Sequence, residues 1–359
     1  MHVLLAAMML SGLPPGAQDR SADPASLAAA GWAAVEERRF GDALDAFTRA
    51  ADRRDDPMLH LGAGFAALML GQHRDAEAWL ERALALAPGL TDASVLLGEV
   101  LYRGGRLRDA IEVYEAALER APGHRTLEQS LAKWRKDADI RAGSYESRGA
   151  HFSVRFQGPA DDLLARRAVE MLEAAYWRVG AALATYPRDA IVVVLYTQEQ
   201  FRDVTRSPAW AAAAYDGIIR VPMRGALARA DDLERLLAHE FVHALVAGLA
   251  GRNVPQWLNE GLASYFESAG ADASGDAASA RIPLPLSGLE GDFGRFSPEE
   301  ASAAYLRSAA AVRRIMQLRG PSAIVALLQD LGRGARFESA FQQRISMRYE
   351  DFQALVDRE

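Results

Sequence analysis

The chain has 359 residues, half of them hydrophobic and a quarter charged, and its 41 Lys and Arg against 48 Asp and Glu give a formal net charge of -7. At about 150 residues per domain, this length predicts two domains in a soluble, globular chain. The acidic balance disfavours the basic surface that nucleic-acid binding requires, so we expect no nucleic-acid partner. Cysteine is absent, so a metal site would have to use His, Asp or Glu.

Residues 1–18 read MHVLLAAMMLSGLPPGAQ, an apolar run followed by a Pro-Gly break. This is the general plan of a secretory signal, although Lys and Arg are missing from its start. The run is too short to span a bilayer, and we expect no membrane span. We therefore expect residues 1–18 to be a signal peptide and the protein to be extracytoplasmic, in the periplasm or secreted. If the segment is not a signal, a cytoplasmic location follows.

Residues 26–124 contain an internal repeat of about 34 residues. The second and third units share small residues at fixed positions, and a fainter first unit precedes them: Gly64, Ala76, Ala83, Pro88 and Gly89; Gly98, Ala110, Ala117, Pro122 and Gly123; Gly31, Ala43, Phe47 and Ala50. Each unit holds two helical patterns around a Gly-containing turn. The segment resembles the tetratricopeptide repeat family, which implies an all-α solenoid of three units that binds a protein partner or recruits a substrate protein.

Residues 125–142 predict one charged helix with Leu127, Leu131 and Trp134 along one stripe. Such a stripe would cover the open end of the last repeat, since a solenoid needs a terminal cap. We interpret this segment as a capping and linking helix.

A second domain is expected over residues 145–357, because strand patterns appear from this point onward. Three strands are predicted first, and helices follow them: strands at His151–Phe156, Ala190–Tyr196 and Asp216–Met223; helices at Ala160–Thr185, from Asp231 onward, Ala301–Leu318, Ser322–Leu331, Phe337–Gln343 and Tyr349–Val356. The run at Ala190–Tyr196 is apolar throughout, which suits a strand buried on both faces. Pro222 suits a sheet edge or a strand end. Residues 268–298 are rich in Gly, Ala, Ser, Asp and Pro and predict a long surface loop. The order of elements indicates an α+β fold.

The helix that starts at Asp231 carries His239-Glu240-Phe241-Val242-His243, an HExxH pattern. Four residues of helix advance by about 400°, so both imidazoles project from nearly the same face and can bind one zinc ion. Glu240 stands beside this pair, where its carboxylate can reach a water on the metal and act as a general base.

A tetrahedral catalytic zinc needs a third protein ligand and keeps its fourth position for water. The metzincin continuation fails, because Val246 and Leu249 stand where that pattern requires Gly and His. A second amphipathic segment, Trp257-Leu258-Asn259-Glu260-Gly261-Leu262-Ala263-Ser264-Tyr265, follows after a Gly- and Pro-containing break. Its Glu260 is far enough along for a returning helix to bring it back to His239 and His243, and we predict it as the third ligand.

The segments HEFVH and WLNEGLASY together resemble the gluzincin metallopeptidases, and with the strand patterns they look most like peptidase-MA-like metallohydrolases. The resemblance covers residues 145–357 and implies a thermolysin-like zincin domain, a small mixed sheet with active-site helices. It also implies zinc held by His239, His243 and Glu260, with Glu240 as base and Asp216–Pro222 as the substrate-facing strand.

The gluzincin aminopeptidases carry a tyrosine that stabilises the oxyanion, in a Tyr-x-Lys-Gly-Ala segment. Tyr305-Leu306-Arg307-Ser308-Ala309 stands in a similar place without the Lys and the Gly, so the resemblance implies this role for Tyr305. The aminopeptidase Gly-x-Met-Glu-Asn segment has no counterpart, which favours an endopeptidase.

Two classes of function remain open. The first is a zinc metallopeptidase that hydrolyses peptide or protein substrates, with the repeats recruiting a partner or substrate. The alternative is a tetratricopeptide scaffold or adaptor whose zincin domain is inactive or keeps zinc for structure. The presence of Glu240 favours catalysis, because a structural zinc site has no use for a base. Hydrolysis of a non-peptide amide or ester also fits such a site.

Overall fold

A computed structural model of the chain describes residues 23–158, 161–187, 190–197, 199–201, 214–215, 217–222, 230–251, 254–267 and 284–358. The expected signal peptide at residues 1–18 lies outside these residues. Within the described part, none of the helices is both long enough and apolar enough to cross a membrane.

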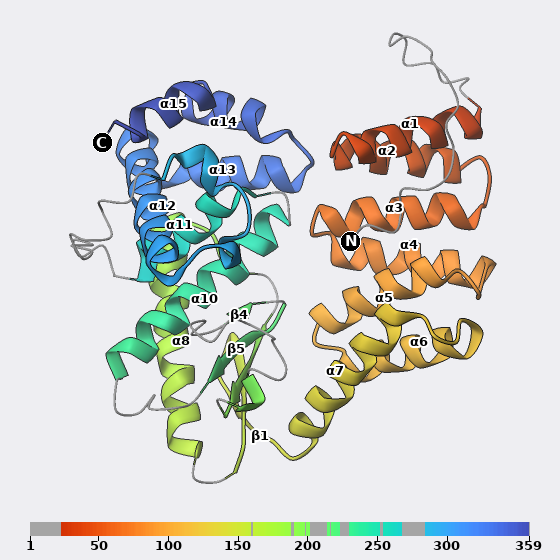
Figure 1. The fold of residues 1–359 in the computed structure, drawn as a ribbon, viewed down its shortest axis with the longest axis horizontal. Helices are drawn as coiled ribbons and strands as arrows, with labels where there is room; N and C mark the ends of the chain where they lie inside the picture. The colour runs from red at the N-terminus through yellow and green to blue at the C-terminus, as the bar shows by residue number, and fades with distance from the viewer. Residues whose placement is uncertain are drawn as a thin grey trace.

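The first third of the chain forms three antiparallel helix pairs, stacked one on the next (Figure 1). Their bounds are α1 (Pro24–Glu36), α2 (Phe40–Ala51), α3 (Pro57–Met69), α4 (His73–Leu86), α5 (Thr91–Arg103) and α6 (Leu107–Arg120). Small residues at the repeated positions let the paired helices approach: a Cβ added at Gly98 would lie 2.1 Å from the Tyr114 ring. The predicted helix pairs are therefore confirmed.

Helix α7 (Arg125–Ala142) coincides with the predicted capping helix. Leu127, Leu131 and Trp134 are buried, and the Trp134 ring packs against Tyr102 and Tyr114 of the third unit. We call α1–α7 the repeat domain.

The second domain is built around a five-stranded mixed sheet with the order β1-β2-β3-β5-β4. Its strands are β1 (Tyr145–Arg148), β2 (Phe152–Phe156), β3 (Ile191–Tyr196), β4 (Ala214–Tyr215) and β5 (Ile219–Pro222). The central strands β2, β3 and β5 run parallel, and the outer strands β1 and β4 are antiparallel to their neighbours.

The sheet corrects one expectation about its edge. The substrate-facing strand that the resemblance implies, Asp216–Pro222, is not at the edge of the sheet, because Ile219 and Arg220 of β5 pair with Tyr215 and Ala214 of β4. In the described part of the chain the edge is therefore β4, a two-residue strand that is too short to produce a sequence pattern. Asp216 itself lies outside the described residues.

The helices described in the second domain follow the predicted order closely: α8 (Asp162–Leu183), α10 (Ala230–Ala250), α11 (Gln256–Glu267), α12 (Pro298–Arg319), α13 (Pro321–Gly332), α14 (Phe337–Ile345) and α15 (Tyr349–Val356). The predicted loop at residues 268–298 is only partly correct. Residues 268–283 are not described, but Leu286–Leu289 and Phe293–Arg295 are 3₁₀ helices whose Leu286, Leu289 and Phe293 are buried. These apolar side chains pack into the core, so the segment is not a simple surface loop.

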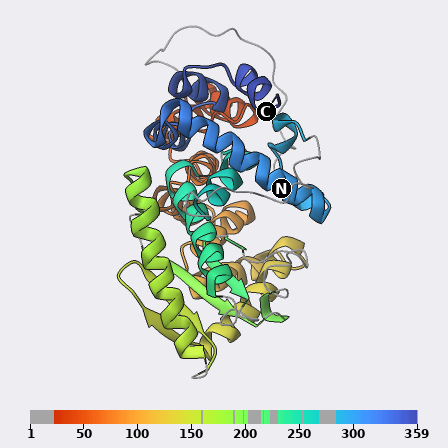
Figure 2. The same cartoon turned by 90° about the vertical axis from the view of Figure 1, so that its left-hand side faces the viewer.

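Both faces of the sheet are covered, as the apolar run of β3 predicts. Val193 and Leu195 belong to the core cluster that includes α8 and α10, whereas Val194 and Tyr196 pack with Ile140 of α7. In Figure 2 the second domain faces the viewer and the helix pairs of the repeat domain lie behind it. The repeat domain thus supplies the layer that covers the second face of the sheet.

The two domains also meet through pairs of glycines. A Cβ at Gly41 would lie 2.7 Å from the Arg333 carbonyl oxygen, and one at Gly334 would lie 2.4 Å from the Gly41 nitrogen. Gly71 and Gly251 oppose each other in the same way, at 2.8 Å and 2.7 Å, and both have positive φ. Any side chain at these four positions would push the backbones apart.

Candidate metal centre

Helices α10 and α11 pack against each other and carry the residues of the candidate site. The first turn of α10 contains Asp231 and Asp232, which suit the positive end of the helix dipole. Leu237 and Phe241 anchor α10 in the core. The centroids of the His239 and His243 rings are 4.8 Å apart, as the four-residue spacing predicts.

Three atoms from the two helices converge on one point. Glu260 Oε2 lies 3.3 Å from His239 Nε2 and 3.3 Å from His243 Nε2. Zinc ligands at about 2.0–2.2 Å in tetrahedral geometry stand roughly 3.3–3.6 Å from one another, so these separations fit a shared ion. Among the described residues, these three form the one cluster of at least three His, Asp or Glu side chains able to hold a metal.

Unpaired buried oxygens provide a second test of this fit. Glu260 Oε2 and Glu240 Oε2 are both buried and lack a hydrogen-bond partner. A buried carboxylate oxygen without a hydrogen bond is costly. Glu260 Oε2 faces the two imidazole Nε2 atoms at 3.3 Å, where a shared cation would join all three. A cation at the first oxygen and a water at the second would satisfy both, and the residues present therefore fit a zinc site.

Each candidate ligand is held from behind by a residue of α11. Glu267 accepts from His239 Nδ1 at 3.1 Å, and Asn259 Oδ1 accepts from His243 Nδ1 at 3.0 Å. These contacts orient both rings so that their Nε2 atoms face the shared point. Gln256 donates to Glu260 Oε1 at 2.8 Å, which fixes the carboxylate so that Oε2 faces the histidines.

Two of these partners, Gln256 and Glu267, are not among the residues predicted from the sequence. The partner of His239 is Glu267, two turns beyond Glu260 and on the same face of α11. Positions Gln256, Glu260 and Glu267 follow helical spacing, and that was the signal that could have found them.

The charges at the site depend on one another. Burial alone would lower the pKa of His239, but the carboxylates of Glu260 and Glu267 raise it to about 10. Burial would raise the pKa of Glu260, and the two adjacent imidazoles outweigh this and hold it well below its usual range. Glu260 is therefore ionised and suited to a cation.

Glu240 is almost fully buried, at 4% exposure. Burial raises the pKa of Glu240, partly offset by His243 and His239. A carboxylate with a raised pKa accepts a proton more readily at neutral pH, which suits a general base.

Tyr305 of α12 lies beside the site, with its ring centroid 6.2 Å from that of His239. Burial, followed by the nearby Glu260 and Glu240, raises the pKa of Tyr305, so its hydroxyl is protonated at neutral pH and can donate a hydrogen bond. Gly261 on α11 lets α12, which carries Tyr305, approach this closely. A Cβ on Gly261 would lie 2.4 Å from the Ser308 carbonyl oxygen on α12.

Comparisons with known proteins concern the repeat domain. Residues 28–91 and residues 67–134 each match a tetratricopeptide repeat family. Small glutamine-rich tetratricopeptide repeat-containing protein 2 of Mycosarcoma maydis is 26% identical over 136 residues, which is 38% of this chain and 38% of that protein. The chain thus spans well under half the length of this relative.

A solved structure, the first tetratricopeptide repeat domain of Spaghetti (RPAP3) bound to the HSP90 peptide SRMEEVD, is 23% identical, with a TM-score of 0.32. It covers 33% of this chain, and the match spans 96% of the solved chain.

The family matches over residues 28–134 confirm the predicted all-α tetratricopeptide solenoid. The family matches end at residue 134, before the candidate metal centre. Of the two functions expected from the sequence, the comparisons support the protein-interaction scaffold better than the peptidase.

Proposed function

We propose that the chain is a zinc-dependent hydrolase that cleaves peptide bonds, with the repeat domain binding a protein partner or the substrate protein. The observation that carries this proposal is the convergence of His239 Nε2, His243 Nε2 and Glu260 Oε2, with 3.3 Å between the carboxylate oxygen and each nitrogen. The partnerless Oε2 of Glu240 supports it further, because a structural metal site does not require a buried carboxylate beside it.

In this proposal His239, His243 and Glu260 hold the zinc, and Glu267, Asn259 and Gln256 fix their orientation. Zinc, when bound, supplies a Lewis acid that polarises a carbonyl group and acidifies water. Glu240 takes a proton from the attacking water and returns it to the departing amine. The Tyr305 hydroxyl donates to the negative charge that develops on the carbonyl oxygen.

Metal analysis combined with proteolysis of denatured casein tests the proposal. We expect about one zinc per wild-type chain and cleavage of casein. Glu240→Gln should retain the metal and lose about 10²–10⁴-fold in rate, since the base is removed while the ligands remain. Equal cleavage by both proteins would remove Glu240 from the mechanism, and a chain without zinc would refute the proposal.

The second candidate is a tetratricopeptide scaffold whose second domain binds zinc without catalysis. The matches over residues 28–134 favour this candidate, because they identify only the protein-binding part. The two candidates differ in one measurable respect: a scaffold retains about one zinc but cleaves neither casein nor small amide and ester substrates. Cleavage of small esters alone would instead indicate a non-peptide hydrolase.

A further inference from the structure

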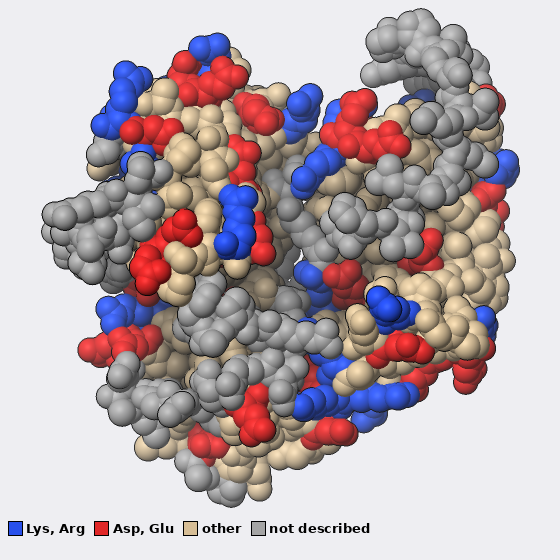
Figure 3. Space-filling view, in the orientation of Figure 1, with Lys and Arg blue, Asp and Glu red and all other residues tan. Residues whose placement is uncertain are grey.

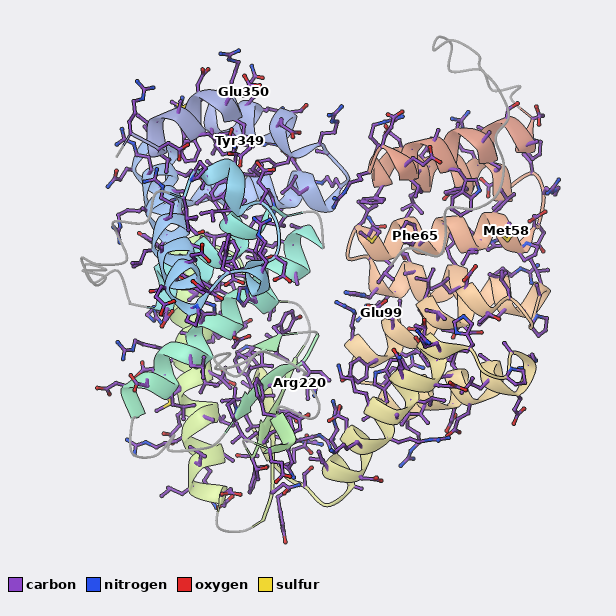
Figure 4. All side chains as sticks on the ribbon, in the orientation of Figure 1. Met58, Phe65, Glu99, Arg220, Tyr349 and Glu350 are labelled. Carbon is purple, nitrogen blue, oxygen red and sulfur yellow. The ribbon has the colours of Figure 1, made fainter. Side chains whose placement is uncertain are left out.

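Arg220 is a fully buried charged residue outside the candidate metal centre, at 0% exposure. It lies on β5, between Ile219 and Val221, which face the core shared with α10. Because side chains alternate along a strand, Arg220 points to the opposite face, toward the repeat domain (Figure 4).

The guanidinium of Arg220 joins the two domains. It donates to the Tyr102 hydroxyl of α5 at 2.5 Å and lies 3.3 Å from Asp137 Oδ2 of α7. It also donates to the Tyr196 hydroxyl of β3, which in turn donates to Asp137 Oδ1 at 2.6 Å. Arg141 completes the cluster with a 2.7 Å bond to Asp137 Oδ2. Two of these partners, Tyr102 and Asp137, belong to the repeat domain.

The backbone of Arg220 has an equally central place in the sheet. It pairs with Val194 of β3 on one side and with Ala214 of β4 on the other. Both β4 and β5 lie against α10, the helix that carries His239 and His243. The position of Arg220 therefore sets the position of the edge strand relative to the candidate metal centre.

A second contact holds the same segment from the repeat domain. A Cβ at Gly217 would lie 2.5 Å from the Arg103 carbonyl oxygen at the end of α5. The backbone just before β5 thus touches α5 directly, next to Tyr102. Side-chain and backbone contacts act together at this end of α5.

We propose that Arg220 is a positioning residue for substrate, through which Tyr102 and Asp137 of the repeat domain fix β5 and β4 beside the metal centre. The inference rests on the proposed function, because it assumes that an extended peptide adds to this sheet edge. It assigns the repeat domain a part in peptide affinity that is separate from any partner it binds.

Tyr102→Phe tests the proposal, because it removes the hydroxyl that accepts from Arg220 and keeps the ring against Trp134. The matched control is Tyr114→Phe, which loses a partly buried 2.9 Å bond to the Val95 carbonyl inside the repeat domain and also keeps its ring against Trp134. Arg220→Lys keeps the positive charge but cannot donate to Tyr102 and Tyr196 with one fork.

We expect Tyr102→Phe to raise KM for a fluorogenic peptide taken from a casein cleavage site by about 3- to 10-fold, with kcat changed less than about twofold. Zinc content should be unchanged. In metal-free protein, the backbone amides of Ile219, Arg220 and Val221 should exchange with deuterium several-fold faster than in wild type. Arg220→Lys should change KM and exchange in the same direction, and Tyr114→Phe should change neither.

Equal KM and equal exchange in Tyr102→Phe and Tyr114→Phe would overturn the inference while leaving the proposed function intact. A parallel fall in kcat and zinc content would also overturn it, because it would indicate general damage to the fold. If wild type neither holds zinc nor cleaves the peptide, the proposed function fails and the substrate role of Arg220 fails with it. The exchange comparison then still decides whether the repeat domain holds β5.

Discussion

Glu267 illustrates how the residues behind the metal ligands control the site. Its carboxylate accepts from His239 Nδ1 and so keeps Nε2 directed at the position shared with Glu260. Glu267→Gln weakens this contact, and we expect zinc affinity to fall about 10- to 100-fold. Competition with a chromophoric chelator measures this loss. Glu350→Gln on the distant α15 (Figure 4) is the control and should bind zinc like wild type. An unchanged affinity in Glu267→Gln would contradict the role.

The ligand set could be predicted from the sequence because it depends on local spacing. His239 and His243 share a helix, and Glu260 stands on the helix that follows. Gln256 and Glu267 were not predicted, because a carboxylate or amide on a helix face has many uses and only the packing of α11 against α10 selects this one. Arg220 was missed for a similar reason, since its partners come from distant parts of the chain.

Asp137 connects stability to pH. Burial alone would raise the pKa of Asp137, but Arg220 and Arg141 outweigh burial and lower it. The folded state therefore binds its proton less readily than the unfolded state, so the stabilisation is complete above about pH 4 and is lost as the pH falls through the lowered pKa.

Asp137→Asn should consequently lower the free energy of unfolding at pH 7 by up to about 3–5 kcal/mol, since it leaves two buried arginines without their carboxylate. The difference from wild type should stay constant between pH 5 and pH 8 and shrink below about pH 4. Urea unfolding followed by circular dichroism measures both. A difference that grows toward low pH would contradict this account.

At the scale of elements, Gly261 sets the distance between α11 and α12. Its missing side chain lets the Ser308 carbonyl oxygen approach, and one turn earlier on α12 stands Tyr305. Gly261→Ala should cost about 1–3 kcal/mol of stability through overpacking and displace Tyr305 from the site. Thermal unfolding measures the first effect, and a fall in kcat with unchanged zinc content reports the second. Gly248→Ala on α10, where an added Cβ meets nothing within 4 Å, is the control.

Long elements with a clear period were predicted well, whereas short ones were not. The helices α12 to α15 and the strand β3 fall within a few residues of their predicted ranges. Strands β1 and β4 were missed because they have four and two residues, and pairing with a neighbour rather than composition makes them strands. The edge of the sheet was assigned wrongly for this reason.

At the scale of the whole molecule, the repeat domain and the sheet share one interior. Ile140 of α7 packs with Val194 and Tyr196, and α7 buries Asp137 against Arg220. An interior that is continuous between the two domains favours their cooperative unfolding. On the outside, acidic and basic side chains are interspersed over the face seen in Figure 3.

Calorimetry should therefore show one thermal transition for the full chain. Zinc should raise the midpoint of this transition, because an ion bound only to the folded state stabilises both domains if they unfold together. Gly71→Val in the repeat domain should lower the same midpoint, because its Cβ would collide with Gly251. Two separate transitions, with only the upper or the lower one responding to zinc, would contradict this expectation.

The opposed glycines of the two domains constrain the number of repeat units in the solenoid. These pairs are Gly41 with Gly334 and Gly71 with Gly251. The first unit of the solenoid contacts the second domain at Gly41 and Gly334, and the second unit contacts it at Gly71 and Gly251. Glycine has no side chain that could fill a gap if these backbones were displaced. Inserting or deleting one 34-residue unit would shift the following units by one repeat and remove these interdomain contacts. Many solenoids gain and lose units freely, but the number of units here is fixed by the partner half of the same polypeptide.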